Sequence, residues 1–329
     1  MIDVPCPFPF SVSPHVEKAR ENLAAWTRDN GLLHGASARE RLDRADFGWF
    51  AALVYPTADE AGLDLMAQWF AWLFLVDDQL DDGDLGRSPK RMAELVTLMR
   101  DVLGDPGPGH GPSLPPVVAS LADLWRRTAP GASPRWGRRF VRHLEECLAT
   151  ATLWEAENRM RGTVPTEDSY ITNRRHTGAI YVCMDLVEIV AGAEVPADAY
   201  DTPEFATALD AACDVVCWVN DVYSLAKERS LGEVHNLVHV VQHHRGLDEH
   251  QALEEVYSAI GQRTDLYLAA EEKLLATYPD ESWPRPVLAG MRTWMRGNLD
   301  WSRCTERYTS GFGDADAYIE AAMLEGGRP

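Results

Sequence analysis

Apolar residues recur at helical spacing along almost the whole chain of 329 residues. Residues three and four apart share one face of an α-helix, whereas a half-buried strand would alternate apolar and polar positions, a pattern that no segment shows convincingly. The connections are rich in proline and glycine, and the longest of them, 104–116, is typical of a surface loop. One large all-α domain is therefore predicted, with helices over residues 16–30, 58–80, 90–103, 117–127, 134–158, 167–193, 203–228, 248–277 and 286–309.

A run of apolar and aromatic residues, 69–76, leads directly into Asp77, Asp78, Asp81 and Asp82. Four carboxylates in six residues repel one another, and a buried ionised carboxylate needs a partner. Mg²⁺ suits this role because it takes oxygen ligands and usually binds one or two carboxylates together with substrate phosphates. Asp77 and Asp81 lie four residues apart on one helix face. The segment predicts a metal-binding rim above an apolar wall, although an exposed acidic helix end would also fit it.

A second row of oxygen ligands comes later in the chain. Asn220, Ser224 and Glu228 step by four and form a row about 12 Å long on one helix face. An amide oxygen, a hydroxyl and a carboxylate can together bind one Mg²⁺. A helix that runs from the core into solvent would also carry polar residues here. Two such rows, each at the end of an apolar helix, favour the metal site much more strongly than either row alone.

The acidic balance of the chain narrows the choice of partners. The chain has 31 Lys and Arg against 51 Asp and Glu, a formal net charge of −20. Nucleic acids and anionic membrane surfaces attract basic proteins, so we expect neither as a partner. An acidic protein that binds an anionic substrate needs metal ions to reverse the local charge.

Several features favour a cytoplasmic location. The first residues lack the basic and apolar regions of a signal peptide. The longest apolar stretch, 63–76, is shorter than the roughly 20 residues that span a bilayer. The six cysteines form no CxxC pair, and Cys183, Cys213 and Cys217 are interpreted as small core residues of a protein in a reducing compartment.

The two rows, DDQLDD at 77–82 and NDVYSLAKE at 220–228, resemble the aspartate-rich motif and the NDxxSxxxE motif of class I terpene synthases, in particular the short bacterial type. Arg174, 46 residues before Asn220, resembles their diphosphate-sensing arginine. The resemblance runs from about residue 5 to residue 315. It implies a single α-helical domain over 1–329 around a central cavity, with residues 1–15 and 310–329 as lid or flexible elements.

The resemblance also implies the metal ligands. Asp77, with one or both of Asp81 and Asp82, would bind two Mg²⁺ ions. The row from Asn220 to Glu228 would bind a third, and Mn²⁺ could replace Mg²⁺. Asp78 would instead accept hydrogen bonds from basic groups.

Basic residues would hold the diphosphate group. The resemblance assigns this role to Arg174, Lys227 and the pair Arg307-Tyr308, and it places Thr177 and Gly178 at a helix break as catalytic residues together with Arg174. Arginine suits a diphosphate because its donors form a rigid fork. Without the motifs, Arg174 and its basic neighbour would be interpreted as a surface pair.

Aromatic residues would line the cavity, because ring faces stabilise a carbocation by roughly 0.5–2 kcal/mol each. Phe70, Phe74 and Trp301 are the candidates. Trp294, Trp301 and Tyr308 are spaced by seven and so form a helical stripe. Such stripes are often core, and Trp294 is interpreted as core. Trp218 points away from the second row and is also interpreted as core.

These features predict the magnesium-dependent ionisation and cyclisation of an isoprenoid diphosphate, with farnesyl diphosphate and a sesquiterpene as the first choice. A diterpene synthase that uses geranylgeranyl diphosphate is the alternative, and geranyl diphosphate also stays open. A chain-elongating prenyltransferase is disfavoured because it would carry a second aspartate-rich motif. A non-catalytic helical isoprenoid-binding protein is the alternative of another class. A monomer and a homodimer are both compatible with the sequence.

Overall fold

The computed structural model describes residues 4–81, 89–104, 114–230, 232–308 and 321–324. Within these ranges the regular structure is helical, and no strand occurs. Asp82, the side chain of Asp81 and most of the predicted lid 310–329 lie outside the described part. No helix of the described chain is long and apolar enough to cross a membrane.

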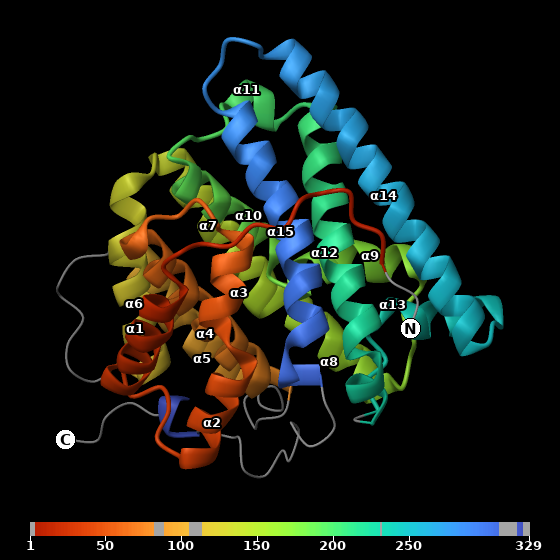
Figure 1. Cartoon of the computed structure of the whole chain (residues 1–329). Helices are drawn as coiled ribbons and strands as arrows, with labels where there is room; N and C mark the ends of the chain where they lie inside the picture. Colours follow the sequence, from red (N-terminus) through yellow and green to blue (C-terminus); the bar gives the residue numbers. More distant parts are fainter. Residues whose placement is uncertain (1–3, 82–88, 105–113, 231, 309–320, 325–329) are drawn as a thin grey trace.

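The helices follow one another with short connections (Figure 1). They are α1 (Val16–Asp29), α2 (Ala36–Ala45), α3 (Phe47–Val54), α4 (Glu60–Asp81), α5 (Pro89–Gly104), α6 (Pro116–Thr128), α7 (Pro134–Glu145), α8 (Thr152–Arg161), α9 (Glu167–Thr177), α10 (Ile180–Ala191), α11 (Ala197–Tyr200), α12 (Pro203–Ser230), α13 (Leu237–Arg245), α14 (Glu249–Thr277) and α15 (Pro284–Cys304). The shorter elements are the 3₁₀ turns η1 (Ala129–Gly131), η3 (Glu306–Tyr308) and η5 (Ala321–Leu324), and the π-helix η2 (Glu146–Ala151).

The sequence predicted the long helices well. The bounds of α1, α4, α5, α6, α12 and α14 lie within two residues of the predicted ones. The helix predicted over 134–158 contains the π-helix η2. The apolar spacing over 167–193 is divided into α9 and α10, and the division falls at the helix break that the resemblance implied for Thr177 and Gly178. The helix predicted over 286–309 ends at Cys304, because Thr305 takes an extended conformation. The short helices α2, α3, α11 and α13 were not predicted.

The bundle packs around α12 and α15. In Figure 1, α14 runs along one outer side next to α12, and α15 lies between α12 and α3. The contact between α15 and α3 is very close, because a Cβ atom on Gly297 would come within 2.7 Å of the backbone carbonyl of Leu53. Only glycine lets the two helices approach this closely.

The N-terminal segment is anchored on this bundle. Val4 and Phe8 are buried, and Arg296 of α15 donates a hydrogen bond to the backbone oxygen of Phe8 at 2.8 Å. The backbone amide of Ser13 donates to Ala52 of α3. Residues 4–15 are therefore fastened to α15 and α3, two helices that also contribute to the wall of the cavity described below.

Candidate active site

A cavity of about 290 Å³ lies inside the bundle, close to the lower end of the range for small-molecule sites. Its wall is built by α3, α4, η2, α8, α9, α10, α12, α15 and η3. Polar and charged side chains form one part of the wall, and apolar and aromatic side chains form the rest. Nearly every site residue predicted from the sequence lies on it: Phe70, Phe74, Asp77, Arg174, Thr177, Gly178, Asn220, Ser224, Lys227, Glu228, Trp301, Arg307 and Tyr308.

The first carboxylate row stands at the end of α4. Asp78 is buried and accepts hydrogen bonds from Arg307 Nη2 at 2.9 Å and Nη1 at 3.3 Å, in keeping with the basic partner that the sequence predicted for it. Asp77 faces the cavity. Burial, and then the charge of Asp78, raise the pKa of Asp77 from 3.8 to about 7. The neighbouring positive charges therefore do not fully offset the cost of ionising Asp77.

The second row lies on α12. Asn220 accepts a hydrogen bond from Arg174 Nη2 at 2.8 Å through Oδ1, and its Nδ2 donates to the hydroxyl of Tyr308. Ser224 Oγ donates to the backbone oxygen of Asn220 at 2.8 Å. Burial, and then the neighbouring Asp221, raise the pKa of Glu228 from 4.5 to about 7. The row thus brings three oxygen-bearing side chains to the cavity, one of them an under-compensated carboxylate.

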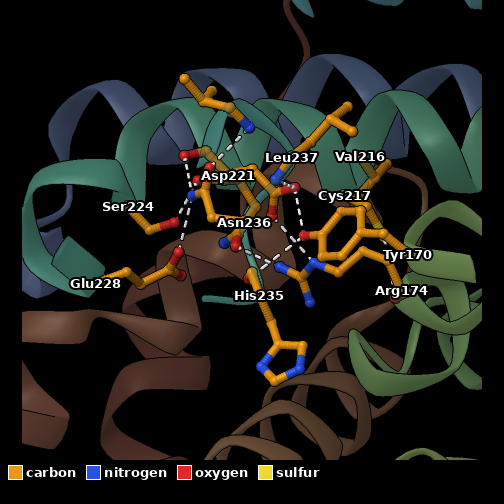
Figure 2. A network of polar contacts seen from close by, with 12 residues as sticks. Tyr170, Arg174, Val216, Cys217, Asp221, Ser224, Glu228, His235, Asn236 and Leu237 are labelled. Atoms are coloured by element: carbon orange, nitrogen blue, oxygen red, sulfur yellow. Dashed lines mark hydrogen bonds and ion pairs between the residues drawn. The ribbon is translucent and has the colours of Figure 1, made fainter. Parts of the chain in front are cut away.

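Arg174 is fixed by a buried network behind the cavity wall (Figure 2). Its Nε donates to Asp221 Oδ1 at 3.0 Å. Asp221 is completely buried and also accepts hydrogen bonds from the hydroxyl of Tyr170 at 2.6 Å and the amide of Leu237 at 3.1 Å. Asp221 therefore holds the guanidinium in one orientation toward Asn220.

Cationic side chains from four different elements line the polar part of the cavity. They are Arg159 from α8, Arg174 from α9, Lys227 from α12 and Arg307 from η3. Burial, and then the charge of Arg307, lower the pKa of Lys227. The guanidinium carbon of Arg307 lies 4.7 Å from the ring centroid of Phe74. The arrangement places positive charge beside both oxygen rows, which suits a highly charged anion such as a diphosphate.

The break between α9 and α10 also lies on the wall. A Cβ atom on Gly178 would come within 3.1 Å of the backbone oxygen of Arg174, 3.2 Å of its Nη1 and 3.3 Å of Cys217 Sγ. Ala179 follows in a left-handed conformation with φ of 55°, unusual for a residue with a side chain. The hydroxyl of Thr177 is buried and has no hydrogen-bond partner among the described residues. The break therefore combines a close approach to Arg174 with a buried hydroxyl that has no hydrogen-bond partner among the described residues.

The aromatic part of the wall is larger than predicted. Trp294 is buried, in line with its interpretation as core, but its ring also lines the cavity. Trp301 stacks on Phe50 at 4.3 Å between ring centroids and donates to the backbone oxygen of Ala45 at 2.9 Å. Trp218 is buried and does not line the cavity. Tyr308 belongs to η3, so the predicted helical stripe of period seven ends at Trp301.

Several wall residues were not predicted from the sequence. Phe50 was missed because α3 is a short run of apolar residues without helical periodicity. Cys183 and Cys217 were interpreted as core, yet both line the cavity together with Cys147. On the polar side the missed residues are Glu155, Arg159, Glu233 and His235.

The site can be tested for its fit to a hard cation. Among residues with described side chains, no three His, Cys, Asp or Glu groups come together as a metal site. The predicted set is of another kind, because Asn220 and Ser224 supply neutral oxygens and two of its aspartates, Asp81 and Asp82, lack described side chains. The raised pKa values of Asp77 and Glu228 report negative charge that a bound cation would relieve. The oxygen donors and their charge fit a divalent cation.

A helical bundle with oxygen ligands and cations at one end of a central cavity and aromatic rings along the rest of it is the arrangement of a class I terpene synthase. The family model described as "Terpene synthase family 2, C-terminal metal binding" matches residues 68–265. The chain belongs to this family, and within it to the bacterial class I terpene synthases, whose C-terminal region binds metal.

Curated relatives match over almost the whole chain. The (+)-T-muurolol synthase of Roseiflexus castenholzii, named as cyclising (2E,6E)-farnesyl diphosphate, is 35% identical over 92% of both chains. The pentalenene synthase of Streptomyces avermitilis is 30% identical over 96% of both chains. Among solved structures, that of α-eudesmol synthase superposes with a TM-score of 0.80 at 28% identity, covering 94% of this chain and all of the other.

Proposed function

We propose that this protein ionises farnesyl diphosphate and cyclises the resulting carbocation to a sesquiterpene, with release of diphosphate. The proposal rests above all on one observation: Asp77, the row from Asn220 to Glu228, four cationic side chains and an aromatic wall line a single cavity. The relatives add support for the chain length of the substrate, since the T-muurolol synthase is named for (2E,6E)-farnesyl diphosphate. Geranylgeranyl diphosphate and a diterpene product are the alternative.

The proposed metal ligands are Asp77 with Asp81 or Asp82 for two Mg²⁺ ions, and Asn220, Ser224 and Glu228 for a third. Mn²⁺ would serve in the same positions. Bound there, the ions would act as Lewis acids on the oxygens of the departing diphosphate. Asn220 is prepared for this role, because Arg174 and Tyr308 hold its amide so that Oδ1 and Nδ2 cannot exchange places.

The cationic side chains bind and orient the diphosphate. Arg174 and Lys227 contact it from α9 and α12, and Arg307 and Tyr308 contact it from η3. Donors fixed in advance at a dry site lower the cost of developing negative charge on the leaving group. Thr177 contributes a hydroxyl that has no hydrogen-bond partner among the described residues. Gly178 leaves space beside Arg174 that a side chain would fill.

The apolar wall controls the carbocation. Phe70, Phe74 and Trp301 present ring faces and edges to the cavity, and Trp294 and Phe50 join them. Ring faces attract cations, and an apolar lining disfavours water that would quench the carbocation early. Because the protein supplies no nucleophile in this scheme, the shape of the wall determines which bond forms.

The experiment that tests this function is the incubation of the purified protein with geranyl, farnesyl and geranylgeranyl diphosphate in turn, with and without Mg²⁺. Extracts are analysed by gas chromatography with mass spectrometry, and diphosphate release is measured in parallel. We expect a magnesium-dependent sesquiterpene from farnesyl diphosphate. A C20 product from geranylgeranyl diphosphate would change the assigned substrate to that diphosphate. A longer prenyl diphosphate as product would indicate chain elongation. Substrate binding without diphosphate release would indicate a non-catalytic protein.

A further inference from the structure

Asn236 lies outside both motifs but reaches one of their ligands. It stands directly before α13 and is 1% exposed. Figure 2 shows its side chain beside the end of α12, between Asp221 and Glu228. A buried amide makes hydrogen bonds with most of its polar atoms, so its partners indicate its function.

The partners of Asn236 fix its orientation. Oδ1 accepts a hydrogen bond from the amide of Val238 at 2.9 Å, which caps the start of α13. Nδ2 donates to the backbone oxygen of Asp221 at 2.7 Å and to Glu228 Oε2 at 2.8 Å. If the amide were turned over, its NH2 group would face the N–H donor of Val238, and its oxygen would face two acceptors, the backbone oxygen of Asp221 and Glu228 Oε2. Both ends of the amide are therefore specified by their surroundings.

Glu228 needs such a partner because of its place in the chain. It lies in the last turn of α12, close to the helix end, and a glutamate side chain has several rotatable bonds. The bond from Asn236 to Oε2 ties the carboxylate of Glu228 to the start of α13. The bond to the Asp221 backbone holds Asn236 itself in register with α12.

We propose that Asn236 is a positioning residue that fixes the carboxylate of Glu228 for metal binding. The inference rests on the proposed function, in which Glu228 is a metal ligand. A hydrogen-bonded partner of a metal ligand typically changes metal affinity about 10–100-fold when it is lost. If Asn236 served only as a helix cap, its loss would lower stability without a specific effect on metal binding.

The test separates the two roles by two substitutions. Asn236→Ser keeps a capping oxygen but removes the amide that reaches Glu228, whereas Asn236→Ala removes both. Mn²⁺ binding is measured by electron paramagnetic resonance in the presence of inorganic diphosphate, and thermal unfolding is followed by circular dichroism. We expect both variants to bind Mn²⁺ about tenfold more weakly or worse. Only Asn236→Ala should also lose the stability that comes from the cap.

A matched control and a double mutant sharpen the result. Asp248 caps α14, which contributes no residue to the cavity wall, so Asp248→Ala should lower the melting temperature and leave Mn²⁺ binding unchanged. In a Glu228→Ala background, Asn236→Ser should change the affinity by less than about twofold, because its effect acts through Glu228.

Wild-type affinity in Asn236→Ser, or a full further loss in the Glu228→Ala background, would overturn the inference while the metal site stands. Absence of Mn²⁺ binding by the wild-type protein would overturn the metal site itself, and the inference with it.

Discussion

Asp77 and Glu228 show at the scale of single residues how this site is prepared for cations. Each is a partly buried carboxylate whose pKa is raised to about 7, first by desolvation and then by a neighbouring acidic group. Such groups cost stability, and proteins retain them mainly where function needs them. Their positions were predictable, because both belong to rows with a spacing of four at the ends of apolar helices.

Replacement of Asp77 tests this preparation directly. Asp77→Asn keeps the size of the side chain but removes the charge that a cation would bind. We expect diphosphate release to fall about 100-fold or more, the size of effect seen when one stabilising group for developing charge is lost. The helical circular dichroism signal should stay unchanged. Turnover close to that of the wild-type protein would show that Asp77 is not a metal ligand.

Phe74 tests the aromatic wall. Its ring faces the cavity and lies 4.7 Å below the guanidinium carbon of Arg307. Phe74→Leu should change the proportions of products, because it reshapes the wall, and should slow diphosphate release by less than about tenfold, because the cation–π contact contributes only modestly. Chromatography of the products gives the first quantity, and a diphosphate assay gives the second.

Trp218→Phe is the control for this substitution. Trp218 is a buried aromatic residue of α12, the helix of the second motif, but it does not line the cavity. Its replacement should leave the product profile as it is. An unchanged profile in Phe74→Leu as well would place Phe74 outside the region that the carbocation visits.

At the scale of elements, the break between α9 and α10 sets the position of Arg174. An added methyl group on Gly178 would lie 3.1–3.3 Å from Arg174 and Cys217, tighter than ordinary packing. Gly178→Ala should therefore displace the arginine and lower kcat by about tenfold or more, since small misplacements of a binding group are costly. Steady-state kinetics with farnesyl diphosphate measure this change.

Gly261→Ala provides a glycine control in a helix interior. Gly261 lies in α14, and a Cβ atom there would meet nothing within 4 Å. The substitution should leave kcat unchanged and raise stability by about 0.5–1 kcal/mol, because alanine favours the helix. Wild-type kinetics in Gly178→Ala would contradict the role assigned to the break.

The elements also show where sequence reasoning ends. Long helices such as α12 and α14 repeat their apolar spacing over many turns, so their bounds were predictable. The short α3 is apolar on all sides and shows no period, and Phe50 of the cavity wall was lost with it. The π-helix η2 contains neither proline nor glycine, so no residue signals the interruption that brings Cys147 to the cavity.

At the scale of the whole molecule, the cavity is a product of elements far apart in sequence. The motif residues were predictable because metal ligands impose a spacing within one helix. The ion pair between Asp78 and Arg307 joins residues 229 positions apart, and only the assembled bundle determines it. Similarly, Cys183 and Cys217 could be recognised as buried but not as wall residues. Periodicity identifies which face of a helix points inward, but not whether that face packs against another helix or lines a cavity.

The raised pKa of Asp77 makes the stability of the whole protein depend on pH. In the folded protein Asp77 keeps its proton up to a pKa of about 7, whereas in the unfolded chain it loses it near 3.8. Its contribution to the free energy of unfolding is therefore fully present below about pH 4 and is lost as pH rises through about 7. The lowered pKa values of His176 and His239 act in the opposite direction near pH 6, so the wild-type curve alone does not isolate Asp77.

The difference between the wild-type protein and Asp77→Asn does isolate it. Without metal, the melting temperature of Asp77→Asn relative to wild type should rise between pH 5 and pH 8, because only the wild-type protein acquires the uncompensated charge. At pH 8, addition of Mg²⁺ and inorganic diphosphate should raise the melting temperature of the wild-type protein above that of Asp77→Asn. A ligand at a hundred times its dissociation constant stabilises the folded state by about 2.7 kcal/mol, and the variant should lose most of this gain. Parallel curves, with and without Mg²⁺, would mean that Asp77 neither carries this charge nor binds the metal that relieves it.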